Sequence, residues 1–394
     1  MLSERAGLLA LLCVLVLAGT LSAQSTNQPL DWAKAQRLNA RYQRGEQLTD
    51  EELSTLGRAQ SERTARMGDG APPRTGVFTN RVLWTRHLVP LNALGPGATY
   101  KGQAGGLYGD GANTPPPALV DAARKALATI LPRDGAGNPD PEGRVVLLSI
   151  GMSNTSQEFE RFKTLAESER SRAAALTIID GAQSGRDAAE WDMAHLTALE
   201  VWTEVERRLA VARVSPAQVQ IVWLKQARSS PAHLGEFPRH TDVLKDHLIA
   251  ILQEARRRFP NLSLAYLSSR TYGGYARSAT SPEPYAYESA FAVRGVILDQ
   301  LQGNPRLNSN PARGPVMAPV VLWGPYLWTD GTQPRPDNGL TWEPGDVGPD
   351  GVHPSATGRD KVAQLLVDFF RTDPLARPWF TGIAPEPSGH PGEQ

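Results

Sequence analysis

Two segments far apart in the sequence carry side chains that could perform nucleophilic chemistry. The first is Gly151-Met152-Ser153-Asn154, which follows an apolar run and precedes a helical pattern. A hydroxyl on such a turn lies at the open edge of a sheet, where backbone N–H groups can hold an oxyanion. Serine is also an ordinary helix N-cap residue, so this segment alone is compatible with a purely structural role.

The second segment is Asp350-Gly351-Val352-His353-Pro354, which stands directly before the last helical pattern of the catalytic part. An aspartate and a histidine three residues apart on one loop can pair the carboxylate with one ring nitrogen and turn the other nitrogen outward. That arrangement orients the imidazole as a general base. A lone histidine is most often structural, but the whole pattern is uncommon by chance. We therefore predict a triad of Ser153, His353 and Asp350.

An alternation of apolar runs and helical patterns must position these two segments. The apolar runs lack polar alternation, which indicates a parallel sheet buried on both faces and an α/β fold. Ligands of such sheets bind at the carboxyl ends of the strands, and the first segment directly follows one of the runs. The predicted strands cover 145–150, 176–179, 219–224, 262–267 and 316–323, and the predicted helices cover 117–131, 156–173, 187–212, 240–259, 285–303 and 357–370.

Both segments resemble blocks of the SGNH (GDSL-like) hydrolase superfamily. The nucleophile block of that family follows its first strand, and its Asp-x-x-His block precedes its last helix. The Gly-x-Ser-Asn form at 151–154 looks closest to the sialate O-acetylesterase and acetylxylan esterase branch. The resemblance spans about 145–372 and implies a three-layer α/β/α sandwich with a parallel five-stranded sheet, the flavodoxin-like SGNH hydrolase fold.

The resemblance also implies where an oxyanion would be bound. The family places a glycine N–H after the second strand, and of Gly181 and Gly185 we favour Gly185, which lies just before the next helix. The family further places a side-chain amide after the next strand, usually as Gly-x-Asn-Asp. Here the sequence departs from that pattern and offers Gln226. Together with the N–H of Ser153, these groups form the oxyanion hole that the resemblance implies.

Four further residues are expected to line the substrate pocket. Asn154 adjoins the nucleophile, and Arg270 and Tyr272 follow the fourth predicted strand on the same rim. Trp328 follows the fifth strand, where its ring could stack on a sugar or belong to the core. Turn and packing roles are the alternatives for Arg270 and Tyr272.

The resemblance implies acyl transfer through a covalent serine intermediate, with no cofactor and no metal. Aromatic residues on the rim and a predicted export signal favour an esterase that removes short-chain, O-acetyl groups from carbohydrate. The alternative is a non-catalytic exported module that binds glycan with a degenerate site. The 41 basic and 41 acidic side chains balance, which argues against nucleic acid or a membrane surface as a partner. The oligomeric state is left open.

The first 23 residues are typical of a cleaved signal peptide, with Arg5 ahead of an apolar run over 7–19 and small residues before Gln24. This predicts a secreted or periplasmic protein without stable membrane insertion. An uncleaved anchor is the alternative, although the run is short for a span. The single cysteine, Cys13, lies in this segment, so the mature chain would have no thiol chemistry.

Clusters of proline and glycine divide the rest of the chain. In the first part, Thr49 and Glu52 have the spacing of a capping box at a helix start. The expected parts are a helical extension (24–75), a glycine- and aromatic-rich segment with a helix (76–140), the catalytic domain (141–373) and a Pro/Gly-rich tail (374–394).

Overall fold

The computed structural model describes residues 87–383 together with scattered positions between residues 31 and 55. The chain divides into two units, residues 1–74 and 75–394. In the first unit the predicted capping box is present. The N–H of Glu52 donates to Thr49 Oγ1 over 3.3 Å, and the N–H of Thr49 donates to Glu52 Oε2 over 2.9 Å. The predicted signal peptide lies outside the described residues.

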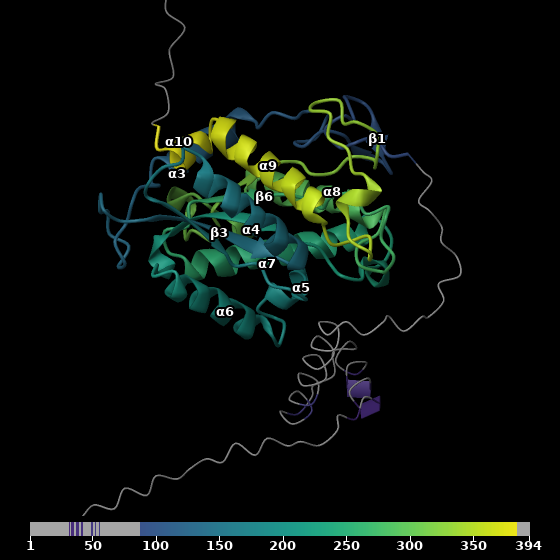
Figure 1. Ribbon diagram of the computed structural model, residues 1–394, viewed down its shortest axis with the longest axis horizontal. Coiled ribbons are helices and arrows are strands. Elements are labelled where there is room, and N and C mark those ends of the chain that lie inside the picture. The colour runs from purple at the N-terminus through teal and green to yellow at the C-terminus, as the bar shows by residue number, and fades with distance from the viewer. Residues whose placement is uncertain are drawn as a thin grey trace, which may run out of the picture. The chain divides into compact units, whose positions relative to one another are not determined.

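The second unit is built on a sheet of five parallel strands (Figure 1). Their order is β4-β3-β5-β6-β7, so β3, the first of them along the chain, lies between β4 and β5. This confirms the predicted α/β class and the parallel five-stranded sheet. The strands are β3 (Val145–Gly151), β4 (Leu176–Asp180), β5 (Val219–Lys225), β6 (Leu264–Leu267) and β7 (Val320–Trp323).

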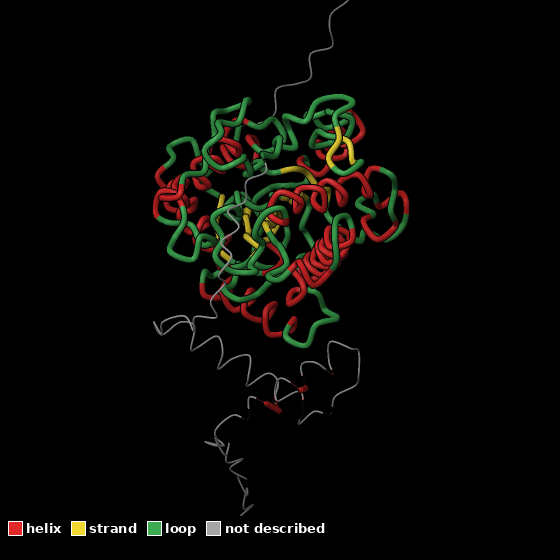
Figure 2. The backbone as a smooth tube through the Cα atoms, turned by 90° about the vertical axis from the view of Figure 1, so that its right-hand side faces the viewer, coloured by secondary structure: helices red, strands yellow, loops and turns green. Residues whose placement is uncertain are grey.

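Helices flank this sheet and complete a layered α/β arrangement (Figures 1 and 2). Parallel crossovers are right-handed, so the reversal of direction at β3 places the helix after β3 on the opposite face from the helices that connect β5 to β7. Accordingly α4 packs against α9, whereas α7 packs against α5 and α8. The helices are α3 (Pro117–Leu127), α4 (Ser153–Ser168), α5 (Ala188–Trp191), α6 (Ala198–Val211), α7 (Arg239–Arg258), α8 (Tyr285–Leu301), α9 (Ala356–Thr372) and α10 (Arg377–Thr381).

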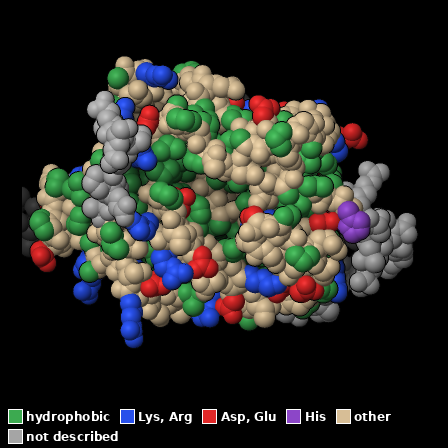
Figure 3. Space-filling model, turned by 90° about the horizontal axis from the view of Figure 1, so that it is seen from above, with side chains coloured by type: hydrophobic (Ala, Val, Ile, Leu, Met, Phe, Trp, Pro, Cys, Tyr) green, Lys and Arg blue, Asp and Glu red, His purple; other side chains and the backbone are tan. Residues whose placement is uncertain are grey.

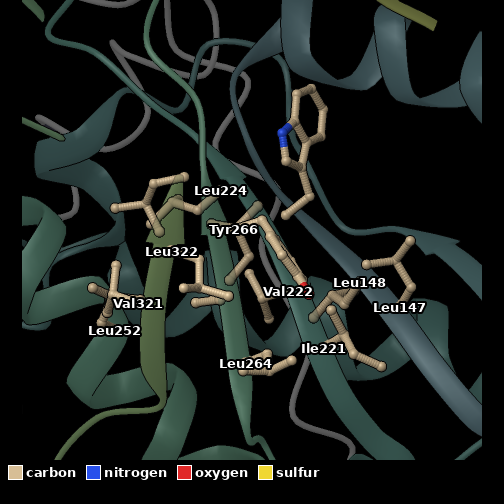
Figure 4. Close-up of a cluster of buried hydrophobic side chains, with 14 of the residues drawn as sticks. Leu147, Leu148, Ile221, Val222, Leu224, Leu252, Leu264, Tyr266, Val321 and Leu322 are labelled. Atoms are coloured by element: carbon tan, nitrogen blue, oxygen red, sulfur yellow. The ribbon is translucent and has the colours of Figure 1, made fainter. Parts of the chain in front are cut away.

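The core sits on the two faces of the sheet, which explains why the strands show no polar alternation. Leu148 of β3, Val222 of β5 and Leu264 of β6 are all buried in the hydrophobic cluster of Figure 4. Tyr266 of β6 is buried as well, and its hydroxyl donates to the carbonyl of Leu375 over 2.8 Å. This packing gives the strand ends a rigid base.

Several predicted elements differ from the structure in their bounds, and the helix predicted over 156–173 is α4, Ser153–Ser168. The helix predicted over 187–212 is two helices, because the chain becomes extended at Asp192, the C-cap of α5. The strand predicted from residue 316 begins only at Val320, since Pro319 has no N–H to join the sheet. Short 3-10 helices fill several connections: η1 (Pro216–Gln218), η2 (Pro231–Leu234), η3 (Pro305–Leu307), η4 (Pro311–Arg313) and η5 (Pro344–Asp346).

The stretch expected to be a Pro/Gly-rich tail begins with an ordered helix, α10. Trp379 and Phe380 of this helix are buried, and their rings lie 5.0 and 6.0 Å from the ring of Phe370. These three aromatic rings bury apolar surface against one another, which explains why the start of the tail is ordered although the tail is rich in proline and glycine. Residues 384–394 lie outside the described part of the chain.

The glycine-rich segment, described from residue 87, packs on α8 and on the edge strand β7. It contains a short hairpin of β1 (Thr99–Tyr100) and β2 (Gln103–Ala104). Glu288 of α8 accepts from Tyr100 Oη over 2.7 Å and from Lys101 Nζ over 2.8 Å. Trp323 Nε1 donates to the carbonyl of Leu107 over 2.8 Å. The segment is therefore a packed part of the second unit.

The surface of this unit carries charges of both signs. On the face seen in Figure 3, basic and acidic side chains are interspersed, and a hollow lined by hydrophobic side chains opens near the centre. Among the described residues, no helix combines the length and apolar character needed to cross a membrane.

Candidate active site

Ser153 is the first residue of α4 and follows directly on the inner strand β3. Its neighbour Met152 is extended, so the chain turns sharply from strand to helix at this point. Gly151 makes the turn possible, because a Cβ at this position would lie 2.4 Å from the side chain of Thr155. The strand order 2-1-3-4-5, counted along the chain, puts this turn at the switch point where ligands bind in open α/β sheets.

Ser153, His353 and Asp350 converge into one hydrogen-bonded chain. Ser153 Oγ lies 2.7 Å from His353 Nε2, and His353 Nδ1 lies 2.5 Å from Asp350 Oδ2. One ring nitrogen therefore faces the hydroxyl while the other faces the carboxylate. This is the geometry in which an imidazole can accept the proton of a serine.

The carboxylate of Asp350 is held in its ionised form. Burial favours the neutral acid, but hydrogen bonds from the His353 ring and from the N–H groups of Val352 and His353 outweigh it and hold the pKa of Asp350 well below its usual range. The His353 side chain is 41% exposed, so a substrate can approach it. A charged carboxylate on Nδ1 favours the tautomer whose Nε2 is free to accept a proton.

The loop that carries Asp350 and His353 is fixed by its neighbours. Gly351 adopts a φ of +70°, and a Cβ there would lie 1.8 Å from the carbonyl oxygen of Tyr275. The N–H of Arg277 donates to the carbonyl of Asp350 over 2.9 Å. Ser355 then caps α9 by accepting from the N–H of Gly358. The loop is thereby positioned by the segment after β6 as well as by α9.

Gly185 and Gln226, the two predicted oxyanion residues, lie in loops that contact each other. Gln226 Nε2 donates to the carbonyl of Arg186 over 3.2 Å, which leaves its second N–H available. Within residues 87–383 the N–H of Gly185 donates to no protein group, whereas the N–H of Gly181 is used by Ser149 Oγ. The structure thus favours Gly185 over Gly181 as the free donor.

Asp187 ties the loop after β4 to the loop after β5. It caps α5 by accepting from the N–H of Ala189, and its other oxygen accepts from the N–H and the hydroxyl of Ser229, both over 2.8 Å. Arg228 Nε lies 3.3 Å from the same oxygen. The two loops that carry Gly185 and Gln226 therefore share one buried carboxylate.

The four expected pocket residues differ in what they can contact. Tyr272 is half-buried, and its ring lies 5.1 Å from that of Tyr275. Asn154 and Arg270 are buried, at 2% and 3% exposure, and both keep side-chain N–H groups without a partner in the described chain. Trp328 is a correction: it is fully buried and donates to Glu283 Oε1 over 2.7 Å, so it cannot stack on a substrate.

Sequence reasoning missed several buried charged groups near these loops. Lys225, the last residue of β5, lies with its Nζ 2.5 Å from Glu158 Oε2 of α4, and both side chains are 1% exposed. Burial lowers the pKa of Lys225 to about 8. Burial also raises the pKa of Glu283 to about 7, although it accepts three hydrogen bonds. The one signal in the sequence was a lysine directly after an apolar run.

Comparisons with known proteins give only distant similarity. No family model and no curated protein matches the chain. Among solved structures the chain is similar to an acetyl xylan esterase, AlAXEase, at 13% identity over 57% of this chain and 98% of that chain, with a TM-score of 0.34. It is also similar to a protein from Arabidopsis thaliana, at 11% identity over 55% of this chain and 67% of that one, with a TM-score of 0.30. Salicylyl-acyltransferase SsfX3 from a tetracycline biosynthetic pathway matches at 16% identity over 60% of this chain and 58% of that one, with a TM-score of 0.33.

Similarity at this level carries no conclusion about chemistry, which rests on the residues of this chain. Among residues 87–383 and the scattered positions before them, no group of three or more His, Cys, Asp or Glu could hold a metal ion. A cavity of about 340 Å³ lies at the β7 edge of the sheet, and none of the triad residues lines it. The site is therefore defined by the hydrogen-bonded chain from Ser153 to Asp350.

Proposed function

We propose that this protein is a serine esterase with Ser153 as nucleophile, His353 as general base and Asp350 as the group that orients the imidazole. The observation that carries the proposal is the continuous contact from Ser153 Oγ through the imidazole to Asp350. A hydroxyl, an imidazole and an ionised carboxylate joined in this order serve to activate a nucleophile. A module that only binds glycan does not need this arrangement.

In the first half-reaction, Ser153 Oγ attacks the ester carbonyl carbon as its proton moves to His353 Nε2. The carbonyl oxygen becomes an oxyanion, which the N–H groups of Ser153 and Gly185 and the amide of Gln226 stabilise. Removing one such donor typically slows turnover by about 100- to 1000-fold. The C–O bond to the alcohol then breaks, and the alcohol leaves with the proton from His353. The acyl group remains on the serine.

In the second half-reaction, water replaces the alcohol. His353 takes a proton from the water as its oxygen attacks the acyl carbon, and a second oxyanion forms in the same place. The bond to Ser153 Oγ breaks, the acid is released, and Ser153 recovers its proton from His353. No redox group and no metal takes part in these steps.

The substrate proposed here is a short-chain ester, in particular an O-acetyl group on carbohydrate, met outside the cytoplasm. The two motifs that resemble the SGNH hydrolases, the aromatic rim residue Tyr272 and the predicted signal peptide support it. The strand order, with Ser153 after β3, the first strand of the parallel sheet along the chain, agrees with membership of the SGNH hydrolases. A non-catalytic glycan-binding module remains the alternative function.

Turnover of simple and polymeric esters distinguishes these functions. We expect the mature protein to hydrolyse 4-nitrophenyl acetate and to release acetate from acetylated xylan, and we expect Ser153→Ala to do neither above background. Ser156→Ala is the matched control, because this hydroxyl lies on the same helix but is engaged with Asp180 Oδ2, to which it donates over 2.5 Å. Binding of xylan by both proteins without acetate release would contradict the esterase and favour the binding module.

A further inference from the structure

A buried cluster of charged side chains lies at the same strand ends as the triad and is incompletely paired. Lys225 and Glu158 form an ion pair of 2.5 Å in which both side chains are 1% exposed. Arg270 adds a second buried cation at 3% exposure. Its Nε and Nη1 are enclosed and have no hydrogen-bond partner in the described chain. Burial lowers the pKa of Arg270, and the acids close enough to oppose this are Glu158, Glu283 and Asp350.

The acids near Arg270 are already engaged with other partners. Glu158 pairs with Lys225, and Asp350 pairs with His353. Glu283 accepts from the Trp328 indole and from the N–H groups of Gly273 and Tyr287. Within residues 87–383, none of these acids forms an ion pair with Arg270. A buried guanidinium without a counter-ion is costly to keep in a folded protein, and a ligand of opposite charge would offset that cost.

The backbone brings the loop that contains Arg270 against the loop of Asp350 and His353. Its N–H donates to Ser289 Oγ of α8 over 3.1 Å, which fixes the start of the loop after β6. The same loop continues to Tyr275 and Arg277, whose backbone groups contact the loop of Asp350 and His353. The carboxyl ends of β3 and β6 lie at one edge of the sheet with β5 between them, and the triad residue Asp350 is close enough to act on the Arg270 guanidinium.

We propose that Arg270 binds a carboxylate of the substrate, so that the enzyme acts on acidic esters. The guanidinium is a permanent cation whose N–H groups suit a carboxylate oxygen, and its Nη2, unlike Nε and Nη1, is not enclosed. Asn154, next to the nucleophile, adds a buried Nδ2 that also lacks a partner. The carboxylate comes either from the alcohol, as in an O-acetylated uronic acid, or from the acyl part, as in the half-ester of a dicarboxylic acid. This inference rests on the proposed esterase activity.

Matched pairs of acidic and neutral esters test the proposal and separate the two sources. One pair is O-acetylated methyl glucuronoside and O-acetylated methyl glucoside, and the other is 4-nitrophenyl hemisuccinate and 4-nitrophenyl butyrate. In at least one pair we expect kcat/KM of the wild type to favour the acidic ester by about tenfold or more. In Arg270→Gln we expect that preference to disappear, mainly through KM, and Arg270→Lys should restore part of it. Arg124→Gln, an exposed arginine of α3, should leave the preference unchanged.

Equal kcat/KM for acidic and neutral esters in the wild type, or a preference that survives in Arg270→Gln, would overturn the proposal. Should Arg270→Gln fail to fold, calorimetric titration of Ser153→Ala with glucuronate, succinate and glucose gives a second test. Glucuronate or succinate must bind at least about tenfold tighter than glucose, and equal binding of all three overturns the proposal. Failure of the esterase itself is distinguishable, because the wild type would then be no faster than Ser153→Ala on any ester.

Discussion

In the proposed mechanism Asp350 acts only through His353, and the effect of removing its charge follows from that role. In Asp350→Asn the amide would present an N–H to Nδ1 and favour the tautomer whose Nε2 carries the proton. We expect kcat for 4-nitrophenyl acetate to fall by about 1000-fold or more, with KM changed much less. Asp121→Asn, an exposed aspartate of α3, is the control. Retention of more than a tenth of the wild-type kcat would contradict the assigned role.

The buried carboxyl of Glu283 makes the stability of the folded protein depend on pH. Burial raises its pKa to about 7 in the folded protein, from an ordinary value of 4.5. The folded state therefore holds a proton that the unfolded chain releases between these values. The stabilisation is fully present below about pH 4.5 and is lost as the pH rises through about 7, by on the order of 3 kcal/mol.

Urea unfolding at about pH 5, 6, 7 and 8 measures this contribution. The free energy of unfolding of the wild type should fall over that range more steeply than that of Glu283→Gln, whose amide does not titrate. Parallel pH dependences in the two proteins would show that Glu283 keeps an ordinary pKa.

The sequence indicates the triad residues but does not indicate the buried charged residues. Ser153 and the Asp350–His353 pair lie at strand and helix boundaries that local sequence patterns mark. The sequence could therefore predict that these residues lie close together. Glu158 and Glu283 look like solvent-facing acids in the sequence, because only the packing of α4 and α8 on other elements buries them. Trp328 is predicted in the pocket but lies in the core, because nothing in the local sequence distinguishes an aromatic residue at the rim from one in the core.

At the scale of elements, the loops after β4 and β5 form one structure around Asp187. In Asp187→Asn an N–H would face the donors of Ser229, so the shared contact would open and Gly185 would lose its fixed position. We expect kcat to fall by about 10- to 100-fold with KM nearly unchanged, because the oxyanion donors act mainly on the transition state. An equal loss in Asp242→Asn, an exposed aspartate of α7, would contradict a specific role of Asp187.

Most strands could be predicted closely because each is a continuous apolar run, whereas the start of β7 and several helix bounds could not. The break between α5 and α6 depends on the cap at Asp187 and its contacts with the next loop, which no periodicity shows. The early start of α4 at Ser153 is also a consequence of the turn at Gly151. These are tertiary effects at the ends of elements, and they are concentrated at the site.

Over the second unit as a whole, Glu288 joins the glycine-rich segment to α7 and α8. This carboxylate is 1% exposed and accepts from Tyr100, Lys101 and His240 Nε2, the last over 2.7 Å. Burial raises its pKa, but these partners outweigh it and keep the pKa below its usual value. The sequence indicates an ordered segment here but not its partner, because the contacts join residues nearly 190 positions apart.

Glu288→Ala removes all three contacts and leaves Lys101 and His240 without their acceptor. We expect the free energy of unfolding to fall by about 2 kcal/mol, because the buried side chain of His240 is left without its hydrogen-bond acceptor. Esterase activity of the protein that remains folded should change by less than about threefold, since Glu288 touches none of the proposed catalytic groups. Glu142→Ala, at an exposed turn, is the control for thermal or urea unfolding. A change of less than about 0.5 kcal/mol would contradict the tether.

The proposed function requires Ser153 to be a nucleophile activated by His353. Its most direct test is to treat the mature protein with a fluorophosphonate probe and to locate the label by mass spectrometry. We expect a single labelled peptide with the modification on Ser153, and loss of that label in Ser153→Ala and in His353→Ala. Labelling of another residue, or none at probe concentrations that label a known serine hydrolase, would contradict it.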